Sequence, residues 1–411
     1  MRALVFGVMP ERVPMPDTDN RLLRSLARTP MRLDPEHADP SLLGPDWVMT
    51  RTRLTGICGS DSKQVFMDWG DEAASPDNPM KGFFSLPQVL GHEVVSVVTE
   101  LGAEAEGLNI GDRVVLNPWL SCGPRGVAPM CAACQIGDYS LCASFGVGPI
   151  APGIHTGTSA DASGGYADLM PAHDSMLFKI PDAISDEVAV FADPFAVMLH
   201  GITRNPPPEG GKAMVYGAGA LGTCAAAILH ALYPSVEVLV IARFAAQASL
   251  ARKFGATVIG HEPALSVIEQ AVDWSGGVLT PSDGLPMAFP GAIDVVYDTV
   301  GKRETFEVGV RVLKARGRLV KAGVHGPTMW EDTPLYFKEI CMVGSNAFGF
   351  EEARGVRQHA IQHYLDMVSD GTIDLTGMLT HTFNLDDWRD AFTALACQGE
   401  SGAIKVAFDF R

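Results

Sequence analysis

The chain has 411 residues, of which 47% are hydrophobic and 19% are charged. At about 150 residues per domain this length predicts two or three domains, and the apolar fraction excludes a largely disordered chain. Lys and Arg number 31 against 48 Asp and Glu, which gives a net charge of −17. Because an acidic chain repels phosphate backbones and anionic lipid, we expect neither nucleic acid nor membrane as a partner.

The N-terminal residues and the cysteines bear on the compartment. The apolar run from Met1 to Gly7 is too short for a secretory signal and soon meets Pro10. No uninterrupted stretch of about 18 apolar residues predicts a transmembrane helix. We therefore expect a cytoplasmic protein, in which cysteines stay reduced and a cluster of them indicates a metal site.

Residues 1 to about 190 predict short strands joined by turns. Val94–Thr99 and Arg113–Leu116 are runs rich in valine, and glycines flank them. Residues 18–45 show little periodicity, and residues 66–87 predict a long surface loop.

The pattern changes after Pro194, where short apolar runs alternate with segments of helical length. This alternation predicts right-handed crossovers and a doubly wound parallel sheet. The expected strands are Ala213–Tyr216, Val236–Ile241, Ile293–Tyr297 and Gly317–Lys321, and the expected helices end at His230 and span Ala245–Phe254. Beyond residue 350 we expect helices at Val356–Ser369 and Leu385–Ala396 and a final strand at Ala403–Phe410.

Four cysteines lie close together in the sequence. Cys131 and Cys134 have two residues between them, a spacing at which two thiolates can bind one tetrahedral ion. Cys142 and Cys122 can close over the same ion from either side. The alternative is four ordinary buried cysteines, and their density favours a metal site.

Two further motifs carry a thiol and an imidazole. Cys58 lies in Gly56–Asp61, and His92 lies in Gly91–Glu93. One Cys and one His supply half of a zinc site, and a third ligand with an open position would make that site catalytic.

A glycine fingerprint follows the expected strand Ala213–Tyr216. Gly217, Gly219 and Gly222, with Ala220 and Leu221 between the last two, form Gly-x-Gly-x-x-Gly at the start of a helix. This context predicts dinucleotide binding, because the glycines permit a tight turn, the approach of a pyrophosphate and close helix packing. The helix N-terminus would add N–H donors.

Together these residues resemble the zinc-containing medium-chain dehydrogenase/reductase family of alcohol, sorbitol and threonine dehydrogenases. The resemblance runs from about residue 40 to the C-terminus. Its motifs stand in the family's order: Gly56–Asp61, Gly91–Glu93, Gly111–Val114, the cysteine cluster, Asp193-Pro194 and the glycine fingerprint.

The resemblance implies an α/β fold with two domains. A GroES-like β-barrel catalytic domain would comprise residues 1–193 and 350–411. A Rossmann domain with its doubly wound parallel sheet would comprise residues 194–349.

The resemblance also assigns roles around a catalytic zinc. Cys58 and His92 would be ligands, with Asp193 as the third ligand where relatives carry Cys or Glu. Aspartate is one methylene shorter than glutamate, so the coordination geometry would differ. Glu93 would lie behind the zinc or displace water from it, and Asp61 would orient His92.

Two residues after Cys58, Ser60 matches the hydroxyl that starts the family's proton relay. Lys63 stands where many relatives have a His further along that relay, and we interpret it as a solvated lysine. Residues 66–87 and 143–160 are expected to shape the substrate pocket as loops.

The cysteine cluster departs from the family pattern. Eight residues separate Cys122 from Cys131, where relatives have two. Because the cost of loop closure grows only logarithmically with length, we expect an intact structural zinc on Cys122, Cys131, Cys134 and Cys142.

For the cofactor we favour NADP(H) over NAD(H). An acidic residue about 20 positions past the fingerprint would bond the adenosine ribose, and that position holds Ala242. No Asp or Glu occurs between Glu237 and Glu262, and Arg243 follows at once with a planar fork that suits a phosphate.

The expected activity is hydride transfer between a small alcohol or carbonyl substrate and the nicotinamide cofactor, in a homodimer or homotetramer. A polyol, an amino alcohol and a simple alcohol all stay open as substrates. The alternative is a catalytically silent zinc- and nucleotide-binding relative with a redox-sensing or structural role.

Overall fold

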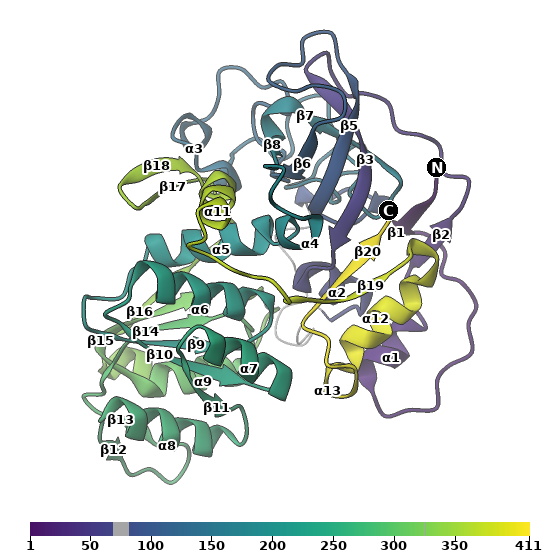
Figure 1. The fold of residues 1–411 in the computed structure, drawn as a ribbon. Coiled ribbons are helices and arrows are strands. Elements are labelled where there is room, and N and C mark those ends of the chain that lie inside the picture. Colours follow the sequence, from purple (N-terminus) through teal and green to yellow (C-terminus); the bar gives the residue numbers. More distant parts are fainter. Residues whose placement is uncertain (69–81, 325) are drawn as a thin grey trace.

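The computed structural model describes residues 1–68, 82–324 and 326–411. Most of the surface loop that we predicted at residues 66–87 lies outside these residues. Two large sheets organise the chain, and both termini lie beside the first of them (Figure 1).

The first sheet is built around the long strand β3 (Trp47–Gly56). It pairs antiparallel with β5 (Glu93–Leu101), β7 (Leu169–His173) and β20 (Lys405–Asp409). The other strands of this sheet are β6 (Arg113–Leu116), β8 (Leu177–Lys179) and β19 (Leu379–Phe383). A smaller sheet beside it holds β1 (Ala3–Phe6), β2 (Met31–Asp34) and β4 (Gln88–Val89).

The second sheet has six parallel strands in the order β11-β10-β9-β14-β15-β16. They are β9 (Lys212–Tyr216), β10 (Glu237–Ala242), β11 (Thr257–Gly260), β14 (Ile293–Asp298), β15 (Leu313–Lys321) and β16 (Cys341–Gly344). This confirms the doubly wound sheet predicted from the alternating pattern.

Helices cover both faces of the parallel sheet. Successive side chains of each strand point to opposite sides of the sheet, so that each face has its own core. Ala213 and Val215 belong to a core shared with α6 (Ala220–Leu232) and α7 (Ala245–Lys253). Met214 and Tyr216 belong to a second core that is shared with α8 (Ala264–Ser275) and α9 (Arg303–Val312).

Helix α5 (Ala192–Thr203) connects the two sheets. Its buried residues share one core with Leu54 and Val95 of the first sheet and with Val215 of the second. On its other side lies α11 (Ala360–Ser369), as Figure 1 shows. The fold therefore places the start of α5 where the two sheets approach each other.

The prediction of a helix at Val356–Ser369 is wrong in its first turn. Residues Phe350–Ala353 and Val356–His359 form the hairpin β17–β18, with a turn at Gly355, whose φ is +74°. The helix begins only at Ala360, because the ring of His359 accepts a hydrogen bond from the backbone of Ile361.

Short helices complete the fold. Residues 18–45, where the sequence showed little periodicity, contain α1 (Arg21–Leu26) as well as β2. The others are α2 (Gly59–Val65), α3 (Ala132–Gln135), α4 (Asp186–Ala189), α10 (Thr333–Phe337), α12 (Trp388–Ala396) and α13 (Gln398–Ser401), with the two-residue strands β12 (Leu279–Thr280) and β13 (Met287–Ala288).

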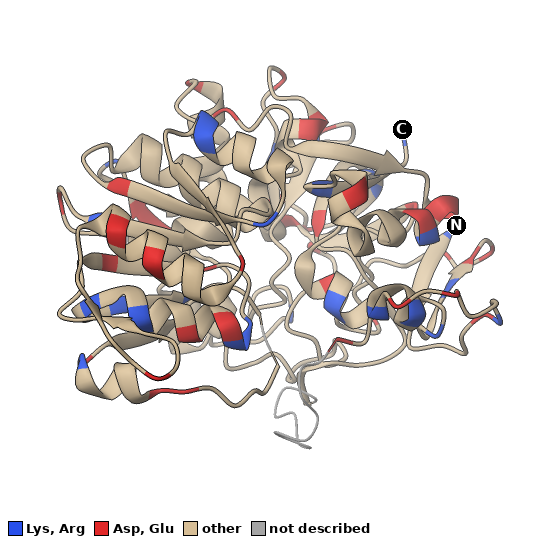
Figure 2. Ribbon diagram, turned by 90° about the horizontal axis from the view of Figure 1, so that it is seen from below, with Lys and Arg blue, Asp and Glu red and all other residues tan. Residues whose placement is uncertain are grey.

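Charged residues of both signs are spread over both halves of the molecule in the view of Figure 2. Within the described residues, each helix is too short or too polar to cross a lipid bilayer.

Candidate active site and metal sites

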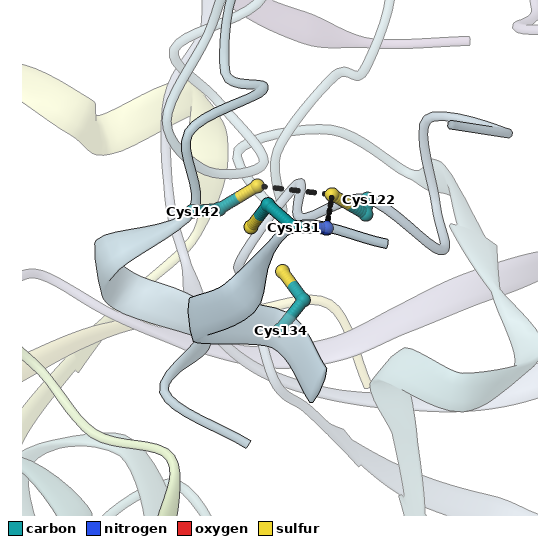
Figure 3. A group of neighbouring side chains, drawn as sticks. All are labelled: Cys122, Cys131, Cys134 and Cys142. Carbon is teal, nitrogen blue, oxygen red and sulfur yellow. Dashed lines mark hydrogen bonds between the residues drawn. The ribbon is translucent and has the colours of Figure 1, made fainter. Parts of the chain in front are cut away.

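The four clustered cysteines converge on one point. Their sulfur atoms all lie within 4.8 Å of one another, and Cys122 Sγ lies 3.6 Å from Cys142 Sγ. Figure 3 shows the four thiols facing a common centre, with α3 starting directly after Cys131 so that Cys131 and Cys134 approach from one side. A tetrahedral site with Zn–S bonds of about 2.3 Å has edges of roughly 3.8 Å, so this donor set fits zinc.

The surroundings of these thiols favour a bound cation. Burial raises the pKa of Cys142 to about 11 and also raises the pKa of Cys134. The backbone N–H of Ala143 instead lowers the pKa of Cys131 to about 6. Since zinc binds thiolates, a cation at the centre would offset the cost of ionising the buried pair. Among the described residues, only these four form so close a group of metal-ligating side chains.

The eight residues between Cys122 and Cys131 have a structural use that the sequence did not reveal. Arg125 lies among them with a fully buried side chain, 0% exposed. Its guanidinium donates hydrogen bonds of 2.7–3.2 Å to five backbone carbonyls, those of Leu120, Val147, Ile150, Ala151 and Gly153.

A second group forms where β3 and β5 meet. Gly56 pairs with Glu93, so Cys58, just after β3, comes close to His92, just before β5. The Cys58 thiol interacts with the ring of His92. Asp193 reaches the same place from the first turn of α5, and its carboxyl group is influenced by the charge of His92.

Asp61 faces His92, as we predicted from the sequence. Its Oδ1 lies 3.4 Å from His92 Nδ1, while its Oδ2 accepts hydrogen bonds from the Cys58 backbone and, at 2.9 Å, from the Tyr166 hydroxyl. With Nδ1 turned toward a carboxylate, the other ring nitrogen is the one available to a metal. Sequence reasoning missed Tyr166, which no local pattern marks.

Three buried carboxyl groups lie in or beside this group. Asp61, Glu93 and Asp193 are 3%, 2% and 7% exposed, and Lys405 is the buried lysine that faces them. Burial raises the pKa of Asp193 to about 7. Burial alone would lower the pKa of His92, but Asp61 and Cys58 outweigh it and raise that pKa well above its usual value. The sulfur, nitrogen and oxygen donors of Cys58, His92 and Asp193 are those that zinc uses.

Glu93 has a partner that the sequence did not predict. Its carboxylate forms an ion pair with Lys405 of β20, and Lys405 Nζ also donates a hydrogen bond to the Ile57 carbonyl at 3.1 Å. A Cβ at Gly56 would lie 2.2 Å from the Glu93 carboxylate, so glycine is needed there. The Glu93 carboxylate is therefore directed toward β20, the last strand of the chain.

Two aromatic residues adjoin His92. The ring of His155 lies 4.6 Å from that of His92, and Trp119 contacts His155 edge-on at 5.8 Å between centroids. Burial lowers the pKa of His155 to about 3. His155 falls in residues 143–160, which we predicted to shape a pocket, but neither residue was singled out from the sequence.

The glycine fingerprint has the geometry expected for a dinucleotide. Gly217 has a φ of +100°, and a Cβ there would collide with Val300 and Thr299. A Cβ at Gly222 would lie 1.9 Å from the Gly217 carbonyl, whereas Gly219, which caps α6, faces open space. Ala220 and Leu221 form the first turn of that helix. The open side at Gly219 fits the approach of a pyrophosphate.

At the far end of β10, Ala242 is buried and Arg243 is exposed, with its guanidinium 5.2 Å from the Phe244 ring centroid. Carboxylate side chains do occur beyond β11, the next strand of the parallel sheet. A hollow of about 540 Å³ beyond β11 is lined by Glu262, Pro263, Ala264 and Glu304.

The environment of Lys63 differs from the solvated one that we expected from the sequence. Its side chain is half-buried on α2, and desolvation lowers its pKa. The charges of Cys58 and of Asp298, the last residue of β14, raise the pKa of Lys63, and the charge of Lys302 lowers it. Ser60 lies on the first turn of the same helix.

Two families of known proteins match parts of the chain. Residues 44–182 match the family described as "Alcohol dehydrogenase GroES-like domain", and residues 220–362 match "Zinc-binding dehydrogenase". The first sheet is thus a GroES-like barrel and the second a Rossmann-type sheet.

Named relatives are similar over most of their length. A protein of Saccharomyces cerevisiae described as a probable diacetyl reductase is 25% identical over 90% of this chain and 85% of its own. The L-threonine 3-dehydrogenase of Pectobacterium carotovorum is 27% identical over 90% and 94%.

Solved structures share the fold. Galactitol-1-phosphate dehydrogenase from Escherichia coli superposes with a TM-score of 0.71 at 19% identity, over 100% of both chains. An alcohol dehydrogenase from Thermus sp. ATN1 gives 0.69 at 23% identity, again over 100% of both chains.

Proposed function

Because the chain belongs to the zinc-containing medium-chain dehydrogenase/reductase family, we propose that it transfers a hydride between a small alcohol or carbonyl substrate and a nicotinamide cofactor. The observation that carries the proposal is the convergence of the half-buried Cys58 with the buried side chains of His92 and Asp193. A silent relative would have no need for such a group beside a nucleotide loop.

Cys58, His92 and Asp193 would hold the catalytic zinc, which supplies Lewis acidity toward the substrate oxygen when bound. Asp61 fixes the orientation of His92, and Tyr166 in turn fixes Asp61 by its hydrogen bond. Glu93 balances Lys405 and so supports the group from behind.

Ser60 and Lys63 lie on the same helix, α2, and we assign them different roles. We propose that the Ser60 hydroxyl starts a proton relay, as the family resemblance implies: it accepts the proton of the substrate oxygen while it passes its own proton on to the next member of the relay. Lys63 stands further along the same helix, toward the end of β14. Its partly desolvated ammonium would hold the nearby anionic groups of a cofactor.

The decisive experiment separates metal from cofactor. Cys58→Ala and His92→Ala should abolish turnover while the affinity for the cofactor stays within twofold, because the fingerprint glycines lie between β9 and the first turns of α6, beside the other sheet. The silent alternative would show bound zinc without alcohol-dependent formation of reduced cofactor. If Cys58→Ala kept near-normal activity on the true substrate, the assignment of the catalytic site would be wrong.

For the cofactor we propose NADP(H). Support comes from Ala242 at the end of β10 and from the exposed Arg243 beside it. Arg243→Ala should lower kcat/KM for NADP by at least about tenfold, since one charge-assisted hydrogen bond contributes about 1.5–3 kcal/mol. Glu262→Gln is the matched control, and we expect it to leave the ratio between the cofactors unchanged. A clear preference of the unmodified enzyme for NAD would overturn the proposal.

We further propose a homo-oligomer that forms through β16. This strand is the edge of the parallel sheet, and large apolar side chains on and near it are exposed, including Met342 at 42%, Phe337 at 64% and Tyr336 at 79%. Exposed apolar edges pair readily with a second copy. Met342→Glu should lower the mass measured by light scattering, whereas Val278→Glu, at another exposed position, should not.

The domain limits and the compartment complete the proposal. We propose limits at 193/194 and 349/350, because every strand of the parallel sheet lies between residues 212 and 344.

We place the protein in the cytoplasm, since all eight cysteines are free.

A further inference from the structure

Helix α5 carries residues of interest at both ends. Asp193, the proposed third ligand of the catalytic zinc, lies in its first turn, and Arg204 is its C-cap. At 1.5 Å per residue the two lie roughly 16 Å apart along the helix axis. Nine of the 12 residues of α5 are buried, and a closely packed interior transmits displacement. Because the side chain of aspartate is short, the position of the Asp193 carboxylate follows the backbone of α5.

One buried carboxylate holds the C-terminal end of this helix. Glu351 of β17 is 2% exposed, and its two oxygens accept hydrogen bonds from His200 Nδ1 at 2.5 Å, Thr203 Oγ1 at 3.3 Å and Arg204 Nε at 3.2 Å. Since a buried carboxylate without partners is costly, these contacts are kept in the folded protein. The hairpin β17–β18 therefore fixes the position at which α5 ends.

Arg204 also reaches the cysteine cluster. Its Nη2 donates a hydrogen bond of 2.5 Å to Asp138 Oδ1, and Asp138 lies between Cys134 and Cys142 in the sequence. The backbone N–H of Asp138 donates to the Ala133 carbonyl at 2.9 Å, so its position depends on the loop that the cysteines hold. An exposed ion pair alone contributes little, but this guanidinium joins two carboxylates, one of which is buried.

The hairpin contacts the same loop beside this ion pair. Phe350 N donates to the Gly137 carbonyl at 3.0 Å, and a Cβ at Gly137, whose φ is +83°, would lie 2.6 Å from the Phe350 ring. Arg357 Nη2 donates to the Ile136 carbonyl at 2.5 Å. The cysteine loop, the hairpin and the end of α5 therefore all contact one another, on the side of the molecule where Figure 1 labels α3, β17 and β18.

We propose that Asp138, Arg204 and Glu351 are positioning residues that couple the cysteine cluster to the proposed catalytic group through α5. Metal bound by the four cysteines fixes the loop at Asp138. Arg204 and Glu351 then fix the end of α5, and the helix fixes Asp193. Zinc at either site therefore strengthens the binding of zinc at the other, by the same factor. This inference rests on the proposed function, in which Asp193 is a zinc ligand.

The zinc affinity of the catalytic group tests the coupling. A competing chelator is titrated against the unmodified protein, Arg204→Met and Cys134→Ser, and the catalytic zinc is assigned as the ion that Cys58→Ala lacks. We expect each of the first two variants to bind this zinc at least about fivefold more weakly, the lower end of typical coupling between sites. Because both changes interrupt one connection, the double variant should lose no more than either single variant.

Arg354→Met is the matched control. Arg354 lies in the turn of the same hairpin but pairs with Asp370 at the end of α11, at 2.6 Å. It contacts neither α5 nor the cysteine loop through this ion pair, so the affinity for the catalytic zinc should stay within twofold.

Two conservative variants separate the contacts of Arg204. Arg204→Lys should recover part of the affinity, because an ammonium can still pair with one of the two carboxylates. Asp138→Asn should weaken the binding of the catalytic zinc while the contact of Arg204 with Glu351 stays in place. The reciprocal measurement uses Cys58→Ala, in which the four cysteines should bind zinc more weakly than in the unmodified protein, by the factor that Cys134→Ser shows at the other site.

The outcomes separate this inference from the proposed function. An unchanged affinity for the catalytic zinc in Arg204→Met, or additive losses in the double variant, overturns the coupling and leaves the dehydrogenase intact. If Cys134→Ser does not fold, the comparison of Arg204→Met with Arg354→Met decides alone. Because no substrate is present, a protein that binds both zinc ions but oxidises no alcohol would lose the proposed function and keep the coupling. A protein whose Cys58 group binds no zinc would lose both.

Discussion

Arg125 offers the sharpest test of how the cysteine segment is built. Replacing it by Met removes five hydrogen bonds at once and leaves five carbonyl groups of residues 120–153 without their donor. Arg125→Lys keeps the charge but offers three donors on a single nitrogen in place of the planar fork. The two variants therefore separate the charge from the geometry.

The expected loss follows from the number and burial of these bonds. A hydrogen bond to a charged group contributes about 1.5–3 kcal/mol, but five bonds to one group are not additive, and desolvation of the guanidinium already offsets part of them. Burial lowers the pKa of Arg125, which is the sign of that desolvation. We expect Arg125→Met to reduce the free energy of unfolding by about 3–5 kcal/mol and Arg125→Lys by about half as much.

Urea unfolding monitored by circular dichroism measures these losses, with Arg32→Met at an exposed position as the control. Zinc release to a chromogenic chelator gives a second readout, since Arg125 stands between Cys122 and Cys131. Release should be faster in Arg125→Met than in Arg32→Met. A loss below about 1 kcal/mol with unchanged zinc release would refute the reasoning, because it would show that water replaces the guanidinium at little cost.

Three further predictions concern metal and charge. Elemental analysis should find two zinc ions per chain, and Cys134→Ser should leave one; a single zinc in the unmodified protein would contradict the two-site assignment. Lys405→Met should cost about 3–5 kcal/mol of unfolding free energy by leaving Glu93 unpaired, and adding Glu93→Gln should restore most of it, so equal losses in both would exclude a coupled pair. Asp186 accepts from Arg53 and Arg113, each at 2.7 Å; burial alone would raise its pKa, but these bonds lower it. Its stabilisation should be complete above about pH 5 and decline as pH falls from about 4 through the lowered native pKa, so that Asp186→Asn flattens the pH profile of unfolding; parallel profiles would contradict this.

The sequence predicted those features whose physical cause is local. Gly217 and Gly222 could be assigned because a fingerprint after an apolar strand has one well-known geometry, and the structure shows the positive φ and the close packing that require glycine. The parallel sheet followed from alternating strands and helices. The convergence of the cysteines followed from a spacing that already brings Cys131 and Cys134 to one ion.

The features that sequence reasoning missed depend on contacts between distant segments. Lys405 reaches Glu93 only because β20 returns to pair with β3, and Tyr166 reaches Asp61 across 105 positions of the chain. The prediction of helix at Val356–His359 is wrong because these residues suit either state, and the pairing of β18 with β17 makes them a strand. Lys63 was read as solvated because its neighbours across the domain boundary are not near it in the sequence.

The segment that carries the cysteines also positions Trp119 and His155, the two aromatic residues near His92. Trp119 stands three residues before Cys122, and Arg125 stands three residues after it. Arg125 in turn holds the carbonyl of Gly153, two residues before His155. A shift at Cys122 would therefore move both Trp119 and His155, whose ring adjoins that of His92. Zinc bound by the four cysteines would therefore stabilise more than its own loop, because the same backbone segments position Trp119 and His155 near the proposed catalytic group.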